Sequence, residues 1–336
     1  MPTSRSTRSC SASASAAASD PSPDGFRYPN RSEVPDPSRV RHCFCVERHG
    51  IALHGCVAGP GHIRYPVPKG LKGVFIMVDA ATEPRLTGSV PLYKNVEPLN
   101  RQKHKSYGVK TVSNPFSFLQ EWHFVPAISP EFAFACGSYP IVFLGEKKMP
   151  VLVMGLRAGT NLFVDENGQF DNEHYIPAYV RRYPFVSASA QNDQPSTVCV
   201  DLDADFVVSE NAERPFFDAQ GEPTDYMKQA IDFVSAFEND ARITEGFVER
   251  LVALDLLEKK DIKVANPQDP ENPVTVAEYW GVSNEKFSAL PAEKLKEMHD
   301  NGDLIAITSH IISLQRWDRI LRRTSLKATA EGQAQA

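Results

Sequence analysis

The stretch that decides the fold spans residues 139–185 and reads YPIVFLGEKKMPVLVMGLRAGTNLFVDENGQFDNEHYIPAYVRRYPF. It contains two apolar runs of residue types that favour strands, Ile141–Leu144 and Val151–Leu156. Polar residues at 146–148 separate the two runs, as a turn between two paired strands requires. The spacing therefore predicts a β-hairpin.

A third strand and a short helical turn are predicted after this hairpin. Residues 161–165 have strand character, and the Asn167-Gly168 pair after them accepts positive φ at both central positions of a tight turn. Residues 175–185 hold four aromatic side chains, two arginines and two prolines, a set too bulky for a free loop. We expect a small antiparallel meander with one helical turn docked on it.

The periodicity of the remaining chain predicts further strands and helices. We expect strands over 116–128, 197–208 and 274–281, and helices over 226–257, 292–301 and 303–323. Thr224 is placed to cap the first helix, Gly302 to end the second and Asp303 to cap the third. His310 falls on the polar margin of the last helix, where a lone histidine is usually structural or exposed. The predicted fold is α+β, a mostly antiparallel sheet covered by a long central helix and a C-terminal helix.

Composition excludes several classes of protein. The chain has 336 residues, 42% of them hydrophobic and 23% charged, so it can bury a large core. Its net charge of −6 argues against general binding of nucleic acid or anionic membranes, which needs a concentrated basic surface. No run reaches the ~18 apolar residues that span a bilayer, and no secretory signal is visible, so the expected compartment is the cytoplasm.

No local motif points to catalysis, a cofactor or a metal. The chain lacks a phosphate-binding glycine loop, a His-Glu-x-x-His and a Gly-x-Ser-x-Gly, and we predict no catalytic residue and no cofactor. The cysteines and histidines between 42 and 62 do not have the spacing of a structural zinc site, which leaves zinc as the less favoured reading. The acidic triplet Asp201, Asp203 and Asp205 lacks the glycine and the glutamate of a calcium loop.

Several motifs, in order along the chain, resemble the bacterial SapC family. They are PLYKNVEPLN at 91–100, YPIVF at 139–143, GLR at 155–157, NLFV at 161–164, YIPAYVRRYPF at 175–185, and FD and GEP at 217–218 and 221–223. The resemblance covers roughly Val90 to Arg322. It implies an association with bacterial surface layers, from which the family takes its name, and it identifies no catalytic residues.

One candidate site for an anionic ligand is predicted from the arginines and tyrosines of the central stretch. Its members are Arg157, Asn161, Tyr179, Arg181, Arg182 and Tyr183. Arginine presents a planar fork suited to carboxylates, and tyrosines can flank it. The alternative is structural, because arginines often pair with buried carboxylates or stack on rings. Glu131 is expected to cap a turn or to face solvent rather than to be a buried, poised carboxylate.

Three functions remain open at this point. The first is a non-catalytic structural or interaction protein with a protein partner, for which the resemblance implies surface-layer association. The second is a cytoplasmic accessory or substrate-binding protein that presents a peptide or carboxylate ligand to a partner enzyme. The third is an enzyme whose site is assembled from scattered residues.

The expected domain organisation has four parts. They are a disordered extension over 1–76, a short leader over 77–89, a single α+β domain over 90–323 and a flexible tail over 324–336. The first part carries 10 Lys/Arg against 5 Asp/Glu, whereas the remainder carries 26 against 37. Residues 72–74 can be encoded by a purine-rich ribosome-binding sequence shortly before Met77. We therefore expect translation to begin at Met77.

Overall fold

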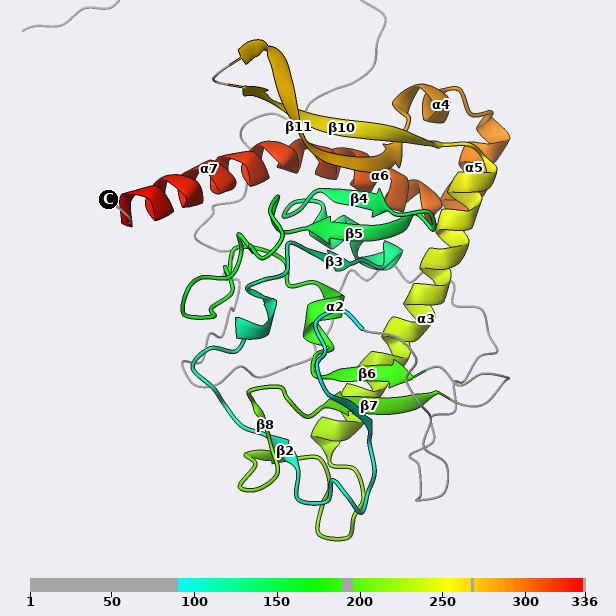
Figure 1. Cartoon of the computed structure of the whole chain (residues 1–336). Coiled ribbons are helices and arrows are strands. Elements are labelled where there is room, and N and C mark those ends of the chain that lie inside the picture. The colour runs from blue at the N-terminus through cyan, green and yellow to red at the C-terminus, as the bar shows by residue number, and fades with distance from the viewer. Residues whose placement is uncertain (1–89, 189–195, 267–268, 335–336) are drawn as a thin grey trace, which may run out of the picture. The chain divides into compact units, whose positions relative to one another are not determined.

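The computed structural model describes residues 90–188, 196–266 and 269–334 (Figure 1). The predictions for residues 1–89, including the start at Met77 and the zinc reading, lie outside these residues. Within them the strands form three sheets, of five, three and three strands, and all pairings are antiparallel. The α+β prediction is confirmed, although the strands do not form one sheet.

The largest sheet is built on the predicted hairpin. Its strand order is β10 (Leu257–Asn266), β11 (Asp269–Val282), β4 (Ile141–Leu144), β5 (Met149–Val153) and β3 (Phe124–Pro126). In the hairpin β4–β5, Ile141 pairs with Leu152, and the turn has positive φ at Gly145 and Lys148. The hairpin is confirmed, and β5 ends at Val153, earlier than predicted.

The prediction of a third strand over 161–165 is wrong, because this segment contributes only an isolated bridge. The Asp165 carboxylate accepts hydrogen bonds from the backbone N–H groups of Asn167 and Gln169, at 2.9 and 2.7 Å. Gly168 has a positive φ of 69°, whereas Asn167 does not. Side-chain bonds of this kind compete with a strand ladder, so the segment is a loop.

The hairpin β10–β11 is longer than the predicted strand at 274–281. It begins within residues that the periodicity assigns to the central helix. Its second strand reaches the rest of the sheet through Trp280, which pairs with Phe143 of β4. The cause is an early end of the helix, since Asp255 has a φ of 52° that breaks helical geometry.

The central helix α3 spans Asp225–Ala253 and contacts strands of all three sheets. Thr224 Oγ1 accepts a hydrogen bond from the N–H of Met227 at 3.3 Å, which confirms the predicted cap. The first half of α3 packs on the sheet ordered β1 (Val96–Pro98), β7 (Thr197–Asp201), β6 (Phe185–Ala188). Its second half packs, through Phe247 and Leu251, into the core of the five-stranded sheet.

Two of the predicted strands are interrupted. The segment 116–128 contains a short 3-10 turn before β3. The segment 197–208 divides because the Asp201 carboxylate accepts the N–H groups of Lys94 and Asn95, both at 2.9 Å, at the end of β7. The third sheet has the order β8 (Val207–Val208), β2 (Gly108–Val109), β9 (Arg214–Pro215).

The other α-helices are α1 (Phe132–Ala135), α2 (Ala178–Arg181), α4 (Asn284–Ser288), α5 (Ala292–Asn301), α6 (Asp303–Ser313) and α7 (Trp317–Ala334). Helix α2 confirms the predicted helical turn, and Gly302, with a φ of 87°, ends α5 as predicted. Asp303 does not cap α6, because its buried carboxylate accepts two hydrogen bonds from Arg250, at 2.6 and 2.7 Å. Helix α7 ends at Ala334 and not near Arg323.

His310 is fully buried, so its placement on a polar margin is wrong. Its Nδ1–H donates to the carbonyl oxygen of Ile141 at 2.8 Å, and its Nε2 accepts the N–H of Val282 at 3.0 Å. The N–H of Ile141 donates to Ser313 Oγ at 2.9 Å. The ring therefore joins β4 to β11, and these partners require the neutral tautomer with its proton on Nδ1.

Acid is expected to destabilise the protein through His310. Burial lowers the pKa of this imidazole from about 6.5 to about 4, and the Lys260 ammonium acts in the same direction. Since the pKa is lower in the folded state, the stabilisation is complete above ~pH 6.5 and is lost as the pH falls toward 4, a change of about 3 kcal/mol.

Urea unfolding of the wild type and of His310→Gln, measured between pH 7 and 4.5, checks this prediction. The free energy of unfolding of the wild type should fall more steeply with acid than that of the variant. Equal slopes for the two proteins would contradict it.

Candidate functional site

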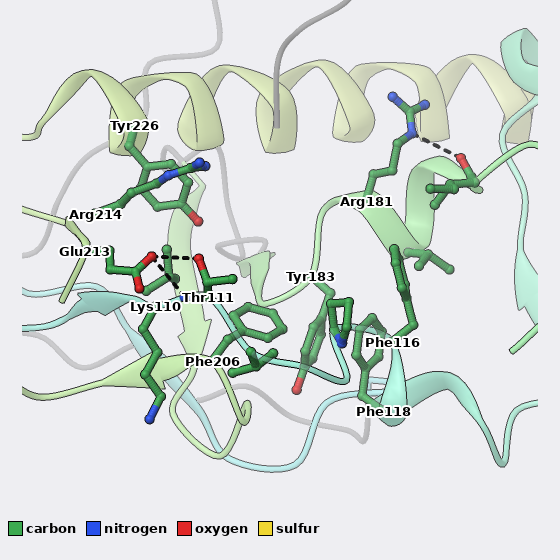
Figure 2. Close-up of a pocket in the computed structure, with 15 residues that line it drawn as sticks. Lys110, Thr111, Phe116, Phe118, Arg181, Tyr183, Phe206, Glu213, Arg214 and Tyr226 are labelled. Carbon is green, nitrogen blue, oxygen red and sulfur yellow. Dashed lines mark hydrogen bonds between the residues drawn. The ribbon is translucent and has the colours of Figure 1, made fainter. Parts of the chain in front are cut away.

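A cavity of about 300 Å³ opens where α2, the third sheet and the start of α3 meet (Figure 2). We call it the aromatic pocket. Its aromatic lining consists of Phe116, Phe118, Tyr183, Phe206 and Tyr226. These rings come from four separate parts of the chain, so the pocket exists only in the folded protein.

The rings of the aromatic pocket hold one another in place. Phe118 stacks on Tyr183 with the ring centroids 4.0 Å apart and 21° between the planes, and Phe206 meets Tyr183 edge-on at 5.7 Å. The Tyr183 hydroxyl donates to Asp201 Oδ2 at 3.3 Å. Burial raises the pKa of Tyr183 above its ordinary value, so this hydroxyl stays neutral. The wall is thus preformed and uncharged, which suits an apolar ligand.

Two charged side chains of opposite sign stand at this pocket. Glu213 Oε2 accepts hydrogen bonds from the hydroxyl and the N–H of Thr111, at 2.6 and 3.2 Å, and these bonds lower the pKa of Glu213. Arg214, in β9, lies by Tyr226 (Figure 2). Its guanidinium forms no hydrogen bond or ion pair with any residue that the structure describes. Arg214 is therefore a half-buried cation available to a ligand.

Lys110 and Arg181 also line the pocket, but Figure 2 shows their charged ends directed away from the rings. Arg181 Nε donates to the carbonyl oxygen of Ile176 at 3.1 Å, and a terminal N–H donates to the Tyr175 hydroxyl at 2.8 Å. The guanidinium lies 5.5 Å from the Tyr175 centroid and 5.2 Å from that of Phe233. Arg181 thus presents its alkyl chain to the aromatic pocket and its charge to the surface beside α3.

Arg182 and Tyr179 belong to a buried cluster elsewhere around α2. The Arg182 guanidinium lies 4.1 Å from the Tyr179 ring centroid and 4.4 Å from that of Phe237. Glu238 Oε1 lies 3.8 Å from Nη1 of Arg182. The Tyr179 hydroxyl donates to the carbonyl oxygen of Pro91 at 2.9 Å. These contacts favour the structural alternative for both residues, because neither side chain reaches the pocket.

Asn161 and Arg157 lie apart from the aromatic pocket. The amide nitrogen of Asn161 donates to two backbone carbonyls, at 2.9 and 3.2 Å, and its oxygen accepts the N–H of Phe163 at 2.8 Å. Arg157 is exposed and lines a different, smaller cavity. Of the predicted residues, the structure brings Arg181 and Tyr183 to the pocket and leaves the others elsewhere. Ligand binding by the predicted set stays a prediction.

Arg214 and most of the aromatic lining could not be found from the sequence. Arg214 occupies a short polar segment without periodicity, and Tyr226 reads as part of the apolar stripe of a helix. Phe206 falls in a segment that predicts a strand. The density of aromatic residues at 116–118 is a local signal, but it does not reveal which distant rings complete the pocket.

Glu131 is buried, so its expected exposure is wrong, whereas its capping role is confirmed. One carboxylate oxygen accepts the N–H of Ile128 at 3.1 Å, and the other accepts the N–H of Ala178 at 2.8 Å. Burial raises the pKa of this carboxyl. Glu131 thereby joins the turn before α1 to the start of α2.

Within the described ranges, no group of three or more His, Cys, Asp or Glu side chains could hold a metal ion. In the same part of the chain, no helix is both long enough and apolar enough to cross a membrane.

Comparison with protein families gives a match to the SapC family over residues 99–320, which includes α2, α3 and every residue lining the aromatic pocket. The chain belongs to the SapC family. The resemblance predicted from the motifs is thereby confirmed. No curated protein and no solved structure matches this SapC chain. The aromatic pocket lies wholly within its SapC region.

Proposed function

We propose that this SapC protein is a non-catalytic binding protein whose aromatic pocket holds the carboxyl-terminal residue of a peptide. The observation that carries the proposal is the guanidinium of Arg214, which has no hydrogen bond or ion pair among the described residues and lies beside a preformed aromatic wall. An apolar side chain would displace water from the rings, and the terminal carboxylate would pair with Arg214.

The size and polarity of the pocket support a single terminal residue. Its volume of about 300 Å³ is at the lower end of the range for small-ligand sites. Both Thr111 bonds reach Oε2 of Glu213, which leaves Oε1 to accept an N–H from the ligand backbone. Arg214 and Glu213 thus match the carboxylate and the amide of a chain end.

The chemistry of the lining supports binding rather than catalysis. The described residues that line the pocket include no His, Cys or Ser, and burial raises the pKa of Tyr226 to about 12, so its hydroxyl is neutral. The Thr111 hydroxyl donates to Glu213, but the lowered pKa makes Glu213 a weak base. The part of the pocket lining that the structure describes therefore holds no activated nucleophile.

The family name supports a surface-layer protein as the source of the peptide, and we include that partner in the proposal. The alternative is a cytoplasmic enzyme to which this protein presents the peptide through the same pocket. Cross-linking in native cells followed by fractionation distinguishes them. A cross-linked partner in the envelope fraction favours the first, and one in the soluble fraction favours the second.

Neutralising Arg214 is expected to weaken the binding of a free carboxylate about tenfold, because a charge-assisted pair is lost. The probe is fluorescein-Gly-Ser-Phe with a free carboxyl terminus, followed by fluorescence anisotropy. Arg214→Gln should lower the affinity for this acid but not for the same probe as an amide.

Arg101→Gln provides the matched control, since Arg101 is a surface arginine paired with Glu222 at 2.9 Å and does not line the pocket. It should bind the acid as the wild type does. Equal binding of acid and amide by the wild type, or no binding at millimolar protein, would refute the proposal.

A further inference from the structure

A second cavity, of about 210 Å³, lies next to the aromatic pocket. Arg181 lines both cavities. The second cavity is bounded by Phe233 and Asp240 of α3 and, opposite them, by Tyr175 and Phe134. Segment 175–181 and helix α3 therefore contribute residues to both cavities.

The register of α3 shows that the two cavities follow one face of the helix. Tyr226 lines the aromatic pocket, whereas Phe233 and Asp240 line the second cavity. Residues seven apart are about two helical turns apart on the same face, so the three side chains mark a line of ~20 Å. Segment 175–181 faces this line along both cavities. We call the combined depression the α3 groove.

Arg181 places a fixed positive charge between the two cavities. Its side chain is exposed, yet its bonds to Ile176 and Tyr175 and its position over Phe233 hold the guanidinium in one place. Because this guanidinium is already held in place, pairing with a carboxylate costs little conformational entropy of the arginine side chain.

The far end of the α3 groove is apolar. Phe134 is 70% exposed and stacks on Tyr175, with the centroids 6.1 Å apart and 21° between the planes. Of the two carboxyls there, Glu131 is bound to backbone N–H groups, and burial raises the pKa of Asp240. This end therefore suits an apolar side chain.

We propose that the α3 groove binds the last five residues of the peptide in an extended conformation, with apolar first and fifth residues and an acidic third residue. The first side chain fills the second cavity, the third pairs with Arg181, and the fifth fills the aromatic pocket. This inference rests on the proposed function. Alternate residues of an extended chain point to the same side, and its first and fifth residues are ~13 Å apart. This distance lies between the ~10 Å from Tyr226 to Phe233 and the ~20 Å from Tyr226 to Asp240 along α3.

Two probes test the α3 groove by fluorescence anisotropy. The long probe is fluorescein-Gly-Leu-Ser-Asp-Ser-Phe, and the short probe is fluorescein-Gly-Ser-Phe, both with free carboxylates. The long probe should bind about tenfold more tightly, because it adds one apolar anchor and one ion pair. Phe134→Ser should remove part of this gain and leave the short probe unaffected, because Phe134 does not line the aromatic pocket. Arg181→Gln should also lower the gain, measured as the ratio of the affinities of the two probes for the same variant, because Arg181 lines both cavities.

Controls separate these contacts from general effects of the substitutions. Leu326→Ser removes a side chain on α7 that is 65% exposed, similar to Phe134, and should bind both probes as the wild type does. When the aspartate of the long probe is replaced by asparagine, Arg181→Gln should cause no further loss.

The outcomes distinguish this inference from the proposed function. If the long probe gains nothing, or if its gain survives both Phe134→Ser and Arg181→Gln, the α3 groove is refuted. Arg214-dependent binding of the short probe would then still support the proposed function. If neither probe binds at millimolar protein, both proposals fail.

Discussion

A protein that ends at Asp303 is expected to be unfolded. The deletion removes most of α6 and all of α7, which supply Ile307, Trp317 and Ile320 to the main core, each at most 6% exposed. Burial of a large apolar side chain is worth roughly 1.5–3 kcal/mol, so these three alone approach the 5–15 kcal/mol total stability of a typical domain.

Polar groups add to the cost of this deletion. Both backbone polar groups of Ile141 bond to α6, the N–H to Ser313 and the carbonyl to His310. Without α6 they would be unpaired inside β4, where each costs about 1–3 kcal/mol. His310 also accepts a hydrogen bond from the N–H of Val282 in β11, so the deletion weakens the attachment of the β10–β11 hairpin.

Circular dichroism and urea unfolding check the result. The matched control is a protein that ends at Thr324, because none of the described side chains beyond this residue is buried. This control should keep a cooperative transition. If the protein ending at Asp303 were monomeric and melted cooperatively, the C-terminal helices would be a detachable docking element and not part of the core.

Arg182→Ala is expected to destabilise the protein by about 3 kcal/mol, the lower end of the range for breaking a buried ion pair. The Arg182 side chain is 5% exposed and is enclosed by the rings of Tyr179, Phe237 and Tyr93. Its removal would leave a cavity and would also leave the Glu238 carboxylate, only 24% exposed, without its cation. Burial already raises the pKa of Glu238, and Arg182 opposes that rise.

The neighbouring residue supplies the control for this prediction. Arg181→Ala removes an exposed side chain and should change the free energy of unfolding by less than about 1 kcal/mol. Arg182→Met combined with Glu238→Gln should recover part of the loss, because it fills the cavity and removes the unpaired charge. An Arg182→Ala protein within about 0.5 kcal/mol of the wild type would contradict the structural role.

These two arginines show where sequence reasoning reaches its limit. Their residue type predicts anion binding for both, yet successive residues of a helical turn point about 100° apart. Arg182, directly after α2, therefore enters the core, whereas Arg181, the last residue of α2, remains at the surface. Which one is buried depends on where α3 packs, and that packing involves residues more than fifty positions along the chain.

The elements that the sequence determined by itself are those whose signals lie within a few residues. The β4–β5 hairpin, the Thr224 cap and the Gly302 end of α5 depend on local apolar runs, a side-chain oxygen and a positive φ. The family also follows from local motifs. The residues of a short segment favour such features by their own conformational preferences, with little dependence on tertiary contacts, so a local pattern predicts them.

Only the tertiary structure decided the roles of His310, Arg182 and Arg214. Burial between two strands makes His310 a bridge, and enclosure by three rings makes Arg182 a core residue. Arg214 becomes the cation of a pocket because Tyr183, Phe118 and other rings from distant segments gather beside it. The physical reason is that burial and pairing decide what a charged side chain does, and both depend on long-range packing that no local pattern records.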